Sequence, residues 1–360
     1  MARFNAQGGQ RVGRIGAIVA PSGIKDVAQR AGVSVGTVSN VLNRPEMVSE
    51  NTRLRVQAAI DALGFVRNEA ARHLRAGQSR TIAYVLLDAG NPFFTDVAKG
   101  VEDVAREHGL AVFLCNSDQD ARREEDYLDL LLEQRVRGVL ITAVDQGSER
   151  LAMLPALGVP VVLVDSPGGE DKHCSVGVDD LEGGDLAVTH LLERGDRSIA
   201  FVGTSTVPQV RSRLEGARRA MERAGLPEAG LTVLETVTLN VAEGQRAGQR
   251  LLGMPARRRP TAVFCANDLL ALGLLQEMTR QGVPVPDELA IVGYDDIEFA
   301  SAAAVPLTSV RQPRKELGRC AAELLLRETE GGGSHRHRSI QFTPELVVRA
   351  SSSGHRSVPR

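Results

Sequence analysis

The N-terminal part of the chain carries apolar residues at helical spacing. Val27, Ala28 and Ala31 repeat at three- and four-residue intervals, which predicts a short helix with one apolar face. Gly32 follows, where a helix commonly ends, and Ser34 is placed to cap a second helix. The apolar positions of that second helix are Val38, Val41 and Leu42. Two short helices joined by a glycine-containing turn predict a helix-turn-helix, whose second helix lies in the DNA major groove.

A third helix is expected to complete this small core. Ser49 is placed to cap it and Gly64 to end it, after Arg44 and Pro45 have broken the chain. Its apolar face consists of Val56, Ala59, Ile60 and Leu63. We therefore predict an all-α domain over residues 24–66.

From Thr81 onward the pattern changes to short apolar runs separated by amphipathic helical stretches. The runs predict strands at 81–87, 110–116, 136–142, 159–165, 198–203, 262–267 and 289–295. Continuous apolar strands that alternate with helices are typical of parallel sheets covered on both faces. About ten such units exceed one sheet, so we expect two doubly wound α/β lobes within residues 81–351.

The motif at the first two helices is more specific than its apolar pattern, which a helical hairpin inside a core would share. It reads Asp-Val-Ala-x-x-Ala-Gly-Val-Ser-x-x-Thr-Val-Ser-x-Val-Leu-Asn, unbroken from Asp26 to Asn43. This resembles the DNA-reading headpiece of the LacI/GalR family of transcriptional repressors, and the resemblance extends over residues 24–351. It implies a homodimer on a palindromic operator. It also implies an effector domain with the fold of periplasmic sugar-binding proteins, in which the chain crosses between lobes near Val178, Leu307 and Ser339.

The resemblance also assigns roles in DNA binding. Residues 67–80 match the hinge segment of the family, in which Leu74 would open a central base step in the minor groove. The other hinge residues that match are Asn68, Ala71 and Arg72, the last as a phosphate partner. A connector with an incidental leucine is the alternative interpretation.

In the second helix, we expect Ser34 and Thr37 to contact phosphates. Val35, Gly36 and Asn40 would face the bases: Val35 offers only methyl contact, Gly36 has no side chain, and Asn40 can bond to adenine. Many relatives carry Arg at position 40, so the operator sequence cannot be borrowed from them.

Charge supports a DNA-contacting module at the N-terminus. Residues 1–80 hold 12 Lys and Arg against 5 Asp and Glu, a balance of +7, whereas the remainder holds 31 against 40, a balance of −9. The formal net charge of −2 therefore conceals a basic first quarter on an acidic body.

Polar residues at the predicted carboxyl ends of the strands indicate a ligand cleft. Carboxylates, an amide and a guanidinium can hold vicinal hydroxyls by charge-assisted hydrogen bonds, and an aromatic ring can supply an apolar platform. The candidate effector contacts are Asp88, Phe93, Phe94, Asp165, Arg213, Asn267 and Asp295, with Arg211 as an alternative to Arg213. Asp268 and Asp296 look more like helix caps. A sugar is the favoured effector, as inducer or corepressor.

Other classes of function fit less well. Motifs for a nucleophile elbow, a phosphate loop or a zinc protease are absent, so no catalytic residue and no cofactor are predicted. A periplasmic solute-binding protein should carry a signal peptide and no helix-turn-helix. His335 and His337 could hold a metal only with help from elsewhere, so no metal site is predicted. We expect a cytoplasmic protein without membrane contact, in which residues 1–23 and 352–360 form a disordered arm and tail.

Overall fold

The computed structural model describes residues 22–65, 79–166, 172–331 and 335–354. The chain divides into two compact units, residues 1–78 and 79–360, which are considered separately below. None of the helices in these described ranges is long and apolar enough to cross a membrane.

The first unit contains the predicted helix-turn-helix. Helices α1 (Ile24–Ala31) and α2 (Val35–Asn43) are joined at Gly32, which has a φ of 61°. A 3₁₀ turn (Pro45–Met47) leads to α3 (Glu50–Leu63). Ser34 caps α2 by accepting a hydrogen bond of 3.0 Å from the backbone N–H of Thr37. Ser49 precedes α3 as predicted, but its hydroxyl lies 3.0 Å from the Thr52 hydroxyl and forms no capping bond to the helix backbone. The core consists of Val27, Ala28, Ala31, Val38, Val56 and Ala59.

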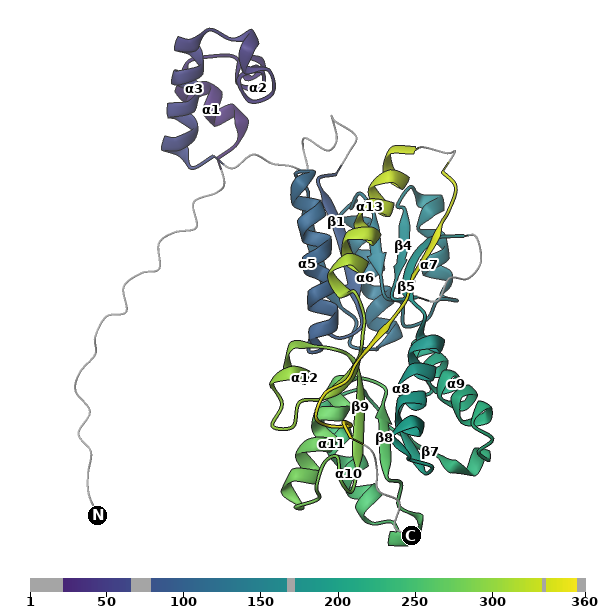
Figure 1. Ribbon diagram of the computed structural model, residues 1–360. Coiled ribbons are helices and arrows are strands. Elements are labelled where there is room, and N and C mark those ends of the chain that lie inside the picture. Colours follow the sequence, from purple (N-terminus) through teal and green to yellow (C-terminus); the bar gives the residue numbers. More distant parts are fainter. Residues whose placement is uncertain (1–21, 66–78, 167–171, 332–334, 355–360) are drawn as a thin grey trace, which may run out of the picture. The chain divides into compact units, whose positions relative to one another are not determined.

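The second unit contains two six-stranded sheets (Figure 1). The first has the strand order β11-β5-β4-β3-β1-β2, and all of its pairings are parallel. Its strands are β1 (Thr81–Leu86), β2 (Ala111–Asn116), β3 (Val139–Ile141), β4 (Val161–Val164), β5 (Cys174–Val178) and β11 (Ser339–Phe342). Helices α5 (Pro92–Glu107) and α13 (Arg314–Gly331) pack on one face, and α6 (Ala121–Glu133) and α7 (Glu149–Met153) on the other. We call this the first lobe.

The second sheet has the order β12-β10-β9-β8-β6-β7 and is parallel except for the pairing of β10 with β12. Its strands are β6 (Ile199–Gly203), β7 (Leu231–Glu235), β8 (Ala262–Cys265), β9 (Ala290–Asp295), β10 (Thr308–Arg311) and β12 (Glu345–Val347). Its helices are α8 (Asp180–Arg194), α9 (Pro208–Arg223), α10 (Val241–Leu252), α11 (Asp268–Arg280) and α12 (Glu298–Ala302). This is the second lobe, and the fold class predicted from the sequence is confirmed.

All seven predicted strands are present, but five others, β5, β7, β10, β11 and β12, were not predicted. The chain passes to the second lobe after Val178, as expected. The other two crossings are displaced. Because β10 belongs to the second sheet, the chain returns after Arg311 rather than near Leu307, and because β11 belongs to the first sheet, it leaves again after Phe342 rather than near Ser339. Local apolarity does not reveal which sheet a strand joins.

Three helix pairs, α5 with α13, α8 with α9 and α10 with α11, are brought close together by glycines. In each pair, both helices place a glycine against a backbone carbonyl of the partner, where a Cβ atom would lie only 2.0–2.1 Å from the oxygen. The glycines are Gly100 and Gly318, Gly184 and Gly216, and Gly244 and Gly273. The absence of a side chain is therefore what sets the separation of these helices.

Replacing Gly273 by Ala should destabilise the second lobe. The new methyl group would meet the Val241 carbonyl oxygen at 2.0 Å, so α10 and α11 must separate. Overpacking of this kind costs about 1–3 kcal/mol, which exceeds the gain of about 1 kcal/mol in helix propensity. The matched control is Gly253→Ala, where the nearest atoms are 3.4 Å away. Urea unfolding should show a lower midpoint for Gly273→Ala only, and equal midpoints would contradict the argument.

Candidate functional site

A cavity lies at the carboxyl ends of the strands, between the two lobes. All seven residues predicted to contact an effector line it: Asp88, Phe93, Phe94, Asp165, Arg213, Asn267 and Asp295. Its other lining residues are Leu87, Asn91, Gln119, Val207, Gln209, Val210 and Leu239. The cavity measures about 40 Å³, room for only a few waters. A sugar therefore requires the lobes or the lining side chains to move.

Arg213, on α9, is the buried cation of this cavity. Its Nε donates to Asp180 Oδ1 at 2.8 Å, and its Nη1 donates to the carbonyl oxygen of Ala266 at 2.7 Å. The guanidinium lies over the ring of Tyr294, 3.7 Å from the centroid, and its Nη1 is 3.9 Å from Asp295 Oδ1. Arg211, also on α9, is exposed and contacts the carbonyl oxygen of Ser205 at 3.1 Å. The structure therefore places Arg213, and not Arg211, in the cavity.

Three buried carboxyl groups surround this one cation, and burial raises their pKa values although the cation opposes the shift. Burial raises the pKa of Asp165 to about 8, with the charge of Asp180 adding to the effect and Arg213 opposing it. Burial likewise raises the pKa of Asp180 and brings that of Asp295 to about 6. The cavity can thus offer both protonated and ionised carboxyl groups near neutral pH, which suits hydroxyl ligands that both donate and accept.

Backbone strain coincides with two of these acids. Asp165 directly follows β4 and has a φ of 52°, and Asp295 ends β9 and has a φ of 102°. Non-glycine residues rarely occupy this region of backbone conformation. Such positions cost about 1–3 kcal/mol and often occur at functional sites. The strain turns both side chains toward the cavity.

The two lobes contact one another across the cavity. Asn91 Nδ2 donates to Asp295 Oδ2 at 3.3 Å, while its Oδ1 caps α5 by accepting from the Phe93 N–H at 3.0 Å. Gln209 Nε2 donates to the carbonyl oxygen of Asp165, and Arg314 Nη1 donates to those of Asp295 and Asp296. These contacts hold the cleft closed, and sequence reasoning missed Gln209 because it lies in a helix rather than at a strand end.

The remaining strand-end residues are used partly in other ways. Asn267 lines the cavity, but its Oδ1 caps α11 at the Leu270 N–H (2.9 Å) and its Nδ2 donates to the carbonyl oxygen of Leu239 (3.0 Å). Asp88 accepts a turn bond of 2.7 Å from the Gly90 N–H. Asn267 and Asp88 therefore have fewer hydrogen-bonding positions free for a ligand than Asp165 has.

Asp268 and Asp296 lie outside the cavity lining, in agreement with the expectation that they are not ligand contacts. Neither side chain, however, caps a helix. Asp268 accepts from the Ser309 hydroxyl at 2.7 Å and the Ile297 N–H at 2.9 Å. Asp296 forms ion pairs with two arginines.

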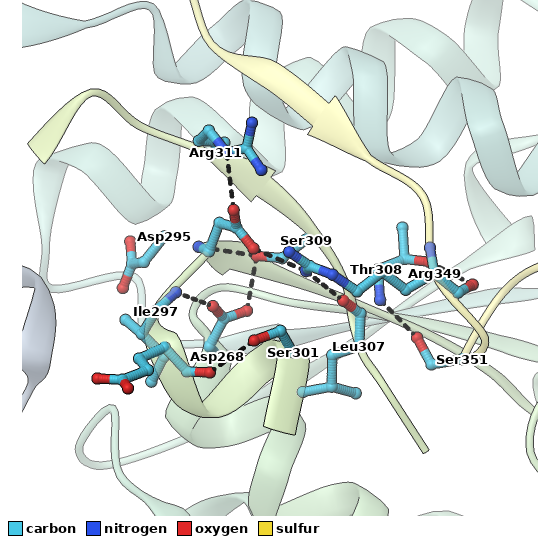
Figure 2. Close-up of polar contacts among 12 residues, drawn as sticks. Asp268, Asp295, Ile297, Ser301, Leu307, Thr308, Ser309, Arg311, Arg349 and Ser351 are labelled. Carbon is cyan, nitrogen blue, oxygen red and sulfur yellow. Dashed lines mark hydrogen bonds and ion pairs between the residues drawn. The ribbon is translucent and has the colours of Figure 1, made fainter. Parts of the chain in front are cut away.

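The pairs of Asp296 lie where the chain crosses between lobes. Its Oδ2 is 2.8 Å from Arg311 Nε, and its Oδ1 is 2.7 Å from Arg349 Nη1. Figure 2 shows Arg311 and Arg349 together with the contacts of Asp268. Arg349 also donates to the carbonyl oxygen of Leu307 at 2.8 Å. These contacts join β9, β10 and the segment after β12.

Helix α2, the second helix of the helix-turn-helix, exposes most of the residues that the sequence analysis predicts to contact DNA. Ser34, Val35, Gly36 and Asn40 are exposed, and Thr37 is half-buried. The Thr37 hydroxyl lies 2.9 Å from that of Ser34, so both can turn toward one phosphate. Arg55 of α3, which the sequence analysis did not single out, donates to the carbonyl oxygen of Ala31 at 2.6 Å and steadies the turn before α2.

The hinge predictions lie outside the described residues. They comprise Asn68, Ala71, Arg72 and Leu74, within residues 66–78.

Comparison with known proteins decides the family. Residues 23–68 match the family described as bacterial regulatory proteins, lacI family, and residues 188–352 match the periplasmic binding protein-like domain. A relative from Aliivibrio fischeri, named HTH-type transcriptional repressor PurR, is 34% identical over 332 residues, 92% of this chain and 98% of that protein. The chain belongs to the LacI family of bacterial regulatory proteins.

Two solved LacI-family structures resemble this chain. The lac repressor dimer bound to operator and the anti-inducer ONPF has a TM-score of 0.77 and 26% identity, and the match covers 92% of this chain and 99% of that one. A LacI-family transcriptional regulator from Enterococcus faecium with bound ribose has a TM-score of 0.69 and 30% identity, covering 76% of this chain and 98% of that one.

The cavity acids should make stability pH-dependent. Because the folded pKa of Asp165 is raised to about 8 from about 3.9 in the unfolded chain, the folded protein keeps a proton that the unfolded chain loses. The stability from this proton is present below about pH 4 and is lost as pH rises toward 8. Asp165→Asn, which is always neutral, should therefore flatten the fall in thermal midpoint between pH 5 and 8.

The comparison with the unchanged protein cancels the other titrating groups, such as Glu124, whose pKa burial raises to about 7. The matched control is Asp287→Asn at an exposed carboxyl group. If Asp165→Asn and the unchanged protein follow parallel curves, Asp165 is ionised in the folded state.

Proposed function

We propose that this LacI-family protein is a dimeric transcriptional repressor whose affinity for a palindromic operator is set by a small hydroxylated effector, most simply a sugar. The main support for the proposal is that seven polar and aromatic residues, predicted from the sequence as effector contacts, line one cavity between the lobes. The same chain exposes most of the residues of α2 that are predicted to contact DNA. The named relative is a transcriptional repressor, and the structural neighbours include an operator complex and a ribose complex.

For DNA binding, α2 enters the major groove with its N-terminal end toward the bases. The hydroxyls of Ser34 and Thr37 bind phosphate, while Val35 and Asn40 supply methyl and amide contacts to base edges. Residues 67–80, with Leu74 as the wedge, would kink the operator between two half-sites. A second copy of the chain would supply the second half-site.

The dimer is supported by the edge of the first sheet. Strand β2 is an edge strand, and its Phe113 and Leu114 are 45% and 57% exposed. Large apolar side chains on an unprotected strand edge are costly for an isolated monomer. A second copy that covers this edge removes that cost.

For effector binding, the ligand must replace the contacts that now close the cavity. Hydroxyl groups would take over the hydrogen bonds that Asn91 and Gln209 make to Asp295 and Asp165, and Phe93 or Phe94 would lie against the ring of the ligand. Binding then changes the separation of the lobes and, through the hinge, the affinity for DNA. An effector that binds the DNA-incompetent state better is an inducer, and the opposite preference makes a corepressor.

The DNA proposal predicts different effects for two residues of α2. Selection from a random double-stranded pool should first yield a palindrome bound by the full chain. Asn40→Ala should then weaken binding by about 1–3 kcal/mol and relax the preference at one base pair of each half-site. Thr37→Val should weaken binding to all sequences about equally. Fluorescence anisotropy against the operator and single-base variants distinguishes these outcomes.

The control is Asn51→Ala, at an exposed asparagine of α3, outside α2. Affinity for the operator should also fall steeply with salt, because Lys and Arg contacts to phosphate release counterions. If no sequence is enriched by a folded dimer, either a corepressor is required or the headpiece does not read DNA; repeating the selection with each compound of the panel below separates the two.

The effector proposal predicts that one of a panel of sugars shifts the thermal midpoint and the operator affinity together. The panel consists of D-ribose, D-xylose, D-glucose and cellobiose, with adenine added because the Phe93–Phe94 pair could also hold a flat ring. Asp295→Asn should weaken binding of the active compound at least about 10-fold, since a charge-assisted hydrogen bond is lost.

Operator affinity without effector should change little in Asp295→Asn, and Asp287→Asn should behave like the unchanged chain in both assays. A compound that binds equally well to Asp295→Asn would place the effector outside this cavity. A response to adenine alone would overturn the sugar assignment but keep the cavity as the effector site.

A further inference from the structure

Four potential metal ligands gather at the edge of the first sheet that lies opposite the effector cavity. They are Cys174 at the start of β5, Glu328 on α13, and His335 and His337 on the segment that leads into β11. Their ligand atoms all lie within 4.8 Å of one another. The Cys174 Sγ is 3.1 Å from His335 Nε2 and 3.9 Å from His337 Nδ1, and His335 Nε2 is 3.9 Å from Glu328 Oε2.

The strand pairing explains why these residues meet although they are far apart in the sequence. Strands β5 and β11 are parallel neighbours with Ser175 opposite Ser339, and the Ser175 N–H donates to the carbonyl oxygen of Arg338 at 2.9 Å. The residues that precede the two strands therefore lie side by side at the amino-terminal edge of the sheet. Helix α13, which contacts β4 and β5, brings Glu328 over the same point.

Two buried polar atoms in and beside the cluster lack a hydrogen-bond partner among the residues that the structure describes. The side chain of Glu328 is only 9% exposed, and its Oε2 makes no hydrogen bond with the described residues. Nearby His173, whose ring centroid is 6.5 Å from that of His337, also has a buried Nδ1 without a hydrogen-bond partner among them. A buried carboxylate left in this condition is costly, and a bound metal ion would remove that cost.

The types of ligand select the metal. One thiolate, two imidazoles and one carboxylate form a mixed soft and borderline set that suits Zn²⁺ and not Ca²⁺ or Mg²⁺, which prefer oxygen alone. With usual Zn–S and Zn–N bond lengths, a tetrahedral site needs ligand atoms about 3.3–3.6 Å apart. The three contacts of 3.1–3.9 Å bracket that range, and all four ligand atoms lie within 4.8 Å of one another, so small side-chain movements suffice to close them around the ion.

We propose that Cys174, Glu328, His335 and His337 form a structural site for a divalent transition-metal ion, with Zn²⁺ as the preferred occupant. The sequence alone did not reveal further metal ligands near the two histidines. In the structure, Cys174 of β5 and Glu328 of α13 lie beside them. Binding would deprotonate the Cys174 thiol, releasing the proton to solvent, and would fasten the segment after α13 to the start of β5. This site is independent of the effector cavity, which lies at the opposite ends of the strands.

The test uses the full chain without a polyhistidine tag. After treatment with chelator, the protein is titrated with Co²⁺, which reports tetrahedral coordination by visible absorption and thiolate ligation by a near-ultraviolet charge-transfer band. We expect one equivalent per chain with both features. Added Zn²⁺ should displace the cobalt and raise the thermal midpoint by roughly 5 °C or more at saturating concentration.

Cys174→Ser should abolish the charge-transfer band, and His337→Gln should lower the cobalt affinity at least about 100-fold. The matched controls are Cys320→Ser, on the same helix as Glu328, and His108→Gln, at the exposed end of α5. Both should bind like the unchanged chain. Circular dichroism at equal temperature verifies that each variant is folded.

A cobalt spectrum without the thiolate band, or one that Cys174→Ser leaves unchanged, would overturn the proposal. So would a thermal midpoint that Zn²⁺ raises equally in the unchanged chain and in both cluster variants, because the metal would then bind elsewhere. Neither result bears on operator binding or on the sugar response, so the metal site and the regulatory function fail separately.

Discussion

The buried guanidinium of Arg213 is the interaction around which the effector cleft is built. It pairs with Asp180 at the start of α8, lies close to Asp295 at the end of β9, and covers Tyr294 between them. An isolated charge is costly to bury, so the surrounding carboxyl groups compensate the guanidinium. These carboxyl groups are themselves buried, which raises their pKa values and favours their neutral forms. These contacts all lie within the second lobe, so the cation orders that wall of the cleft. A ligand competes with these interactions rather than filling an empty hollow.

Close backbone contacts between helices help to set the shape of the lobes. In three helix pairs, glycines let each helix touch the carbonyl oxygens of its partner, and α9 is one of these helices. The position of Arg213 thus depends on Gly216, one turn further along α9, whose missing Cβ lets the helix approach Leu181. In the Arg-x-x-Gly motif, one turn of α9 therefore carries both the buried charge of Arg213 and the glycine, Gly216, that allows the close helix contact.

Much of the fold could be predicted from the sequence because buried parallel strands are continuous apolar runs. Strands β1, β3, β4, β6, β8 and β9 follow that rule, whereas β2 is an apolar run at the sheet edge and is largely exposed. Strands β11 and β12 do not follow it, since they are short and largely exposed, and β10 is polar at Thr308, Ser309 and Arg311. The strand-end residues of the cavity were predictable for a topological reason: parallel strands bring their carboxyl ends together. Gln209, which reaches the cavity from α9, and Asp180, which pairs with Arg213, leave no comparable signal. The cluster at Cys174 depends on a pairing of strands that no local pattern reveals.

The pairing of β5 with β11 has a consequence for how the protein comes into being. Ser175 and Ser339 meet across 164 residues of chain, so during synthesis the edge of β5 stays without a neighbour until almost the whole polypeptide has left the ribosome. The second lobe, except for its edge strand β12, can assemble in the interval, whereas the first lobe must wait for β11. An open strand edge invites pairing with other chains, so the nascent first lobe is the stage at which this protein is most exposed to aggregation.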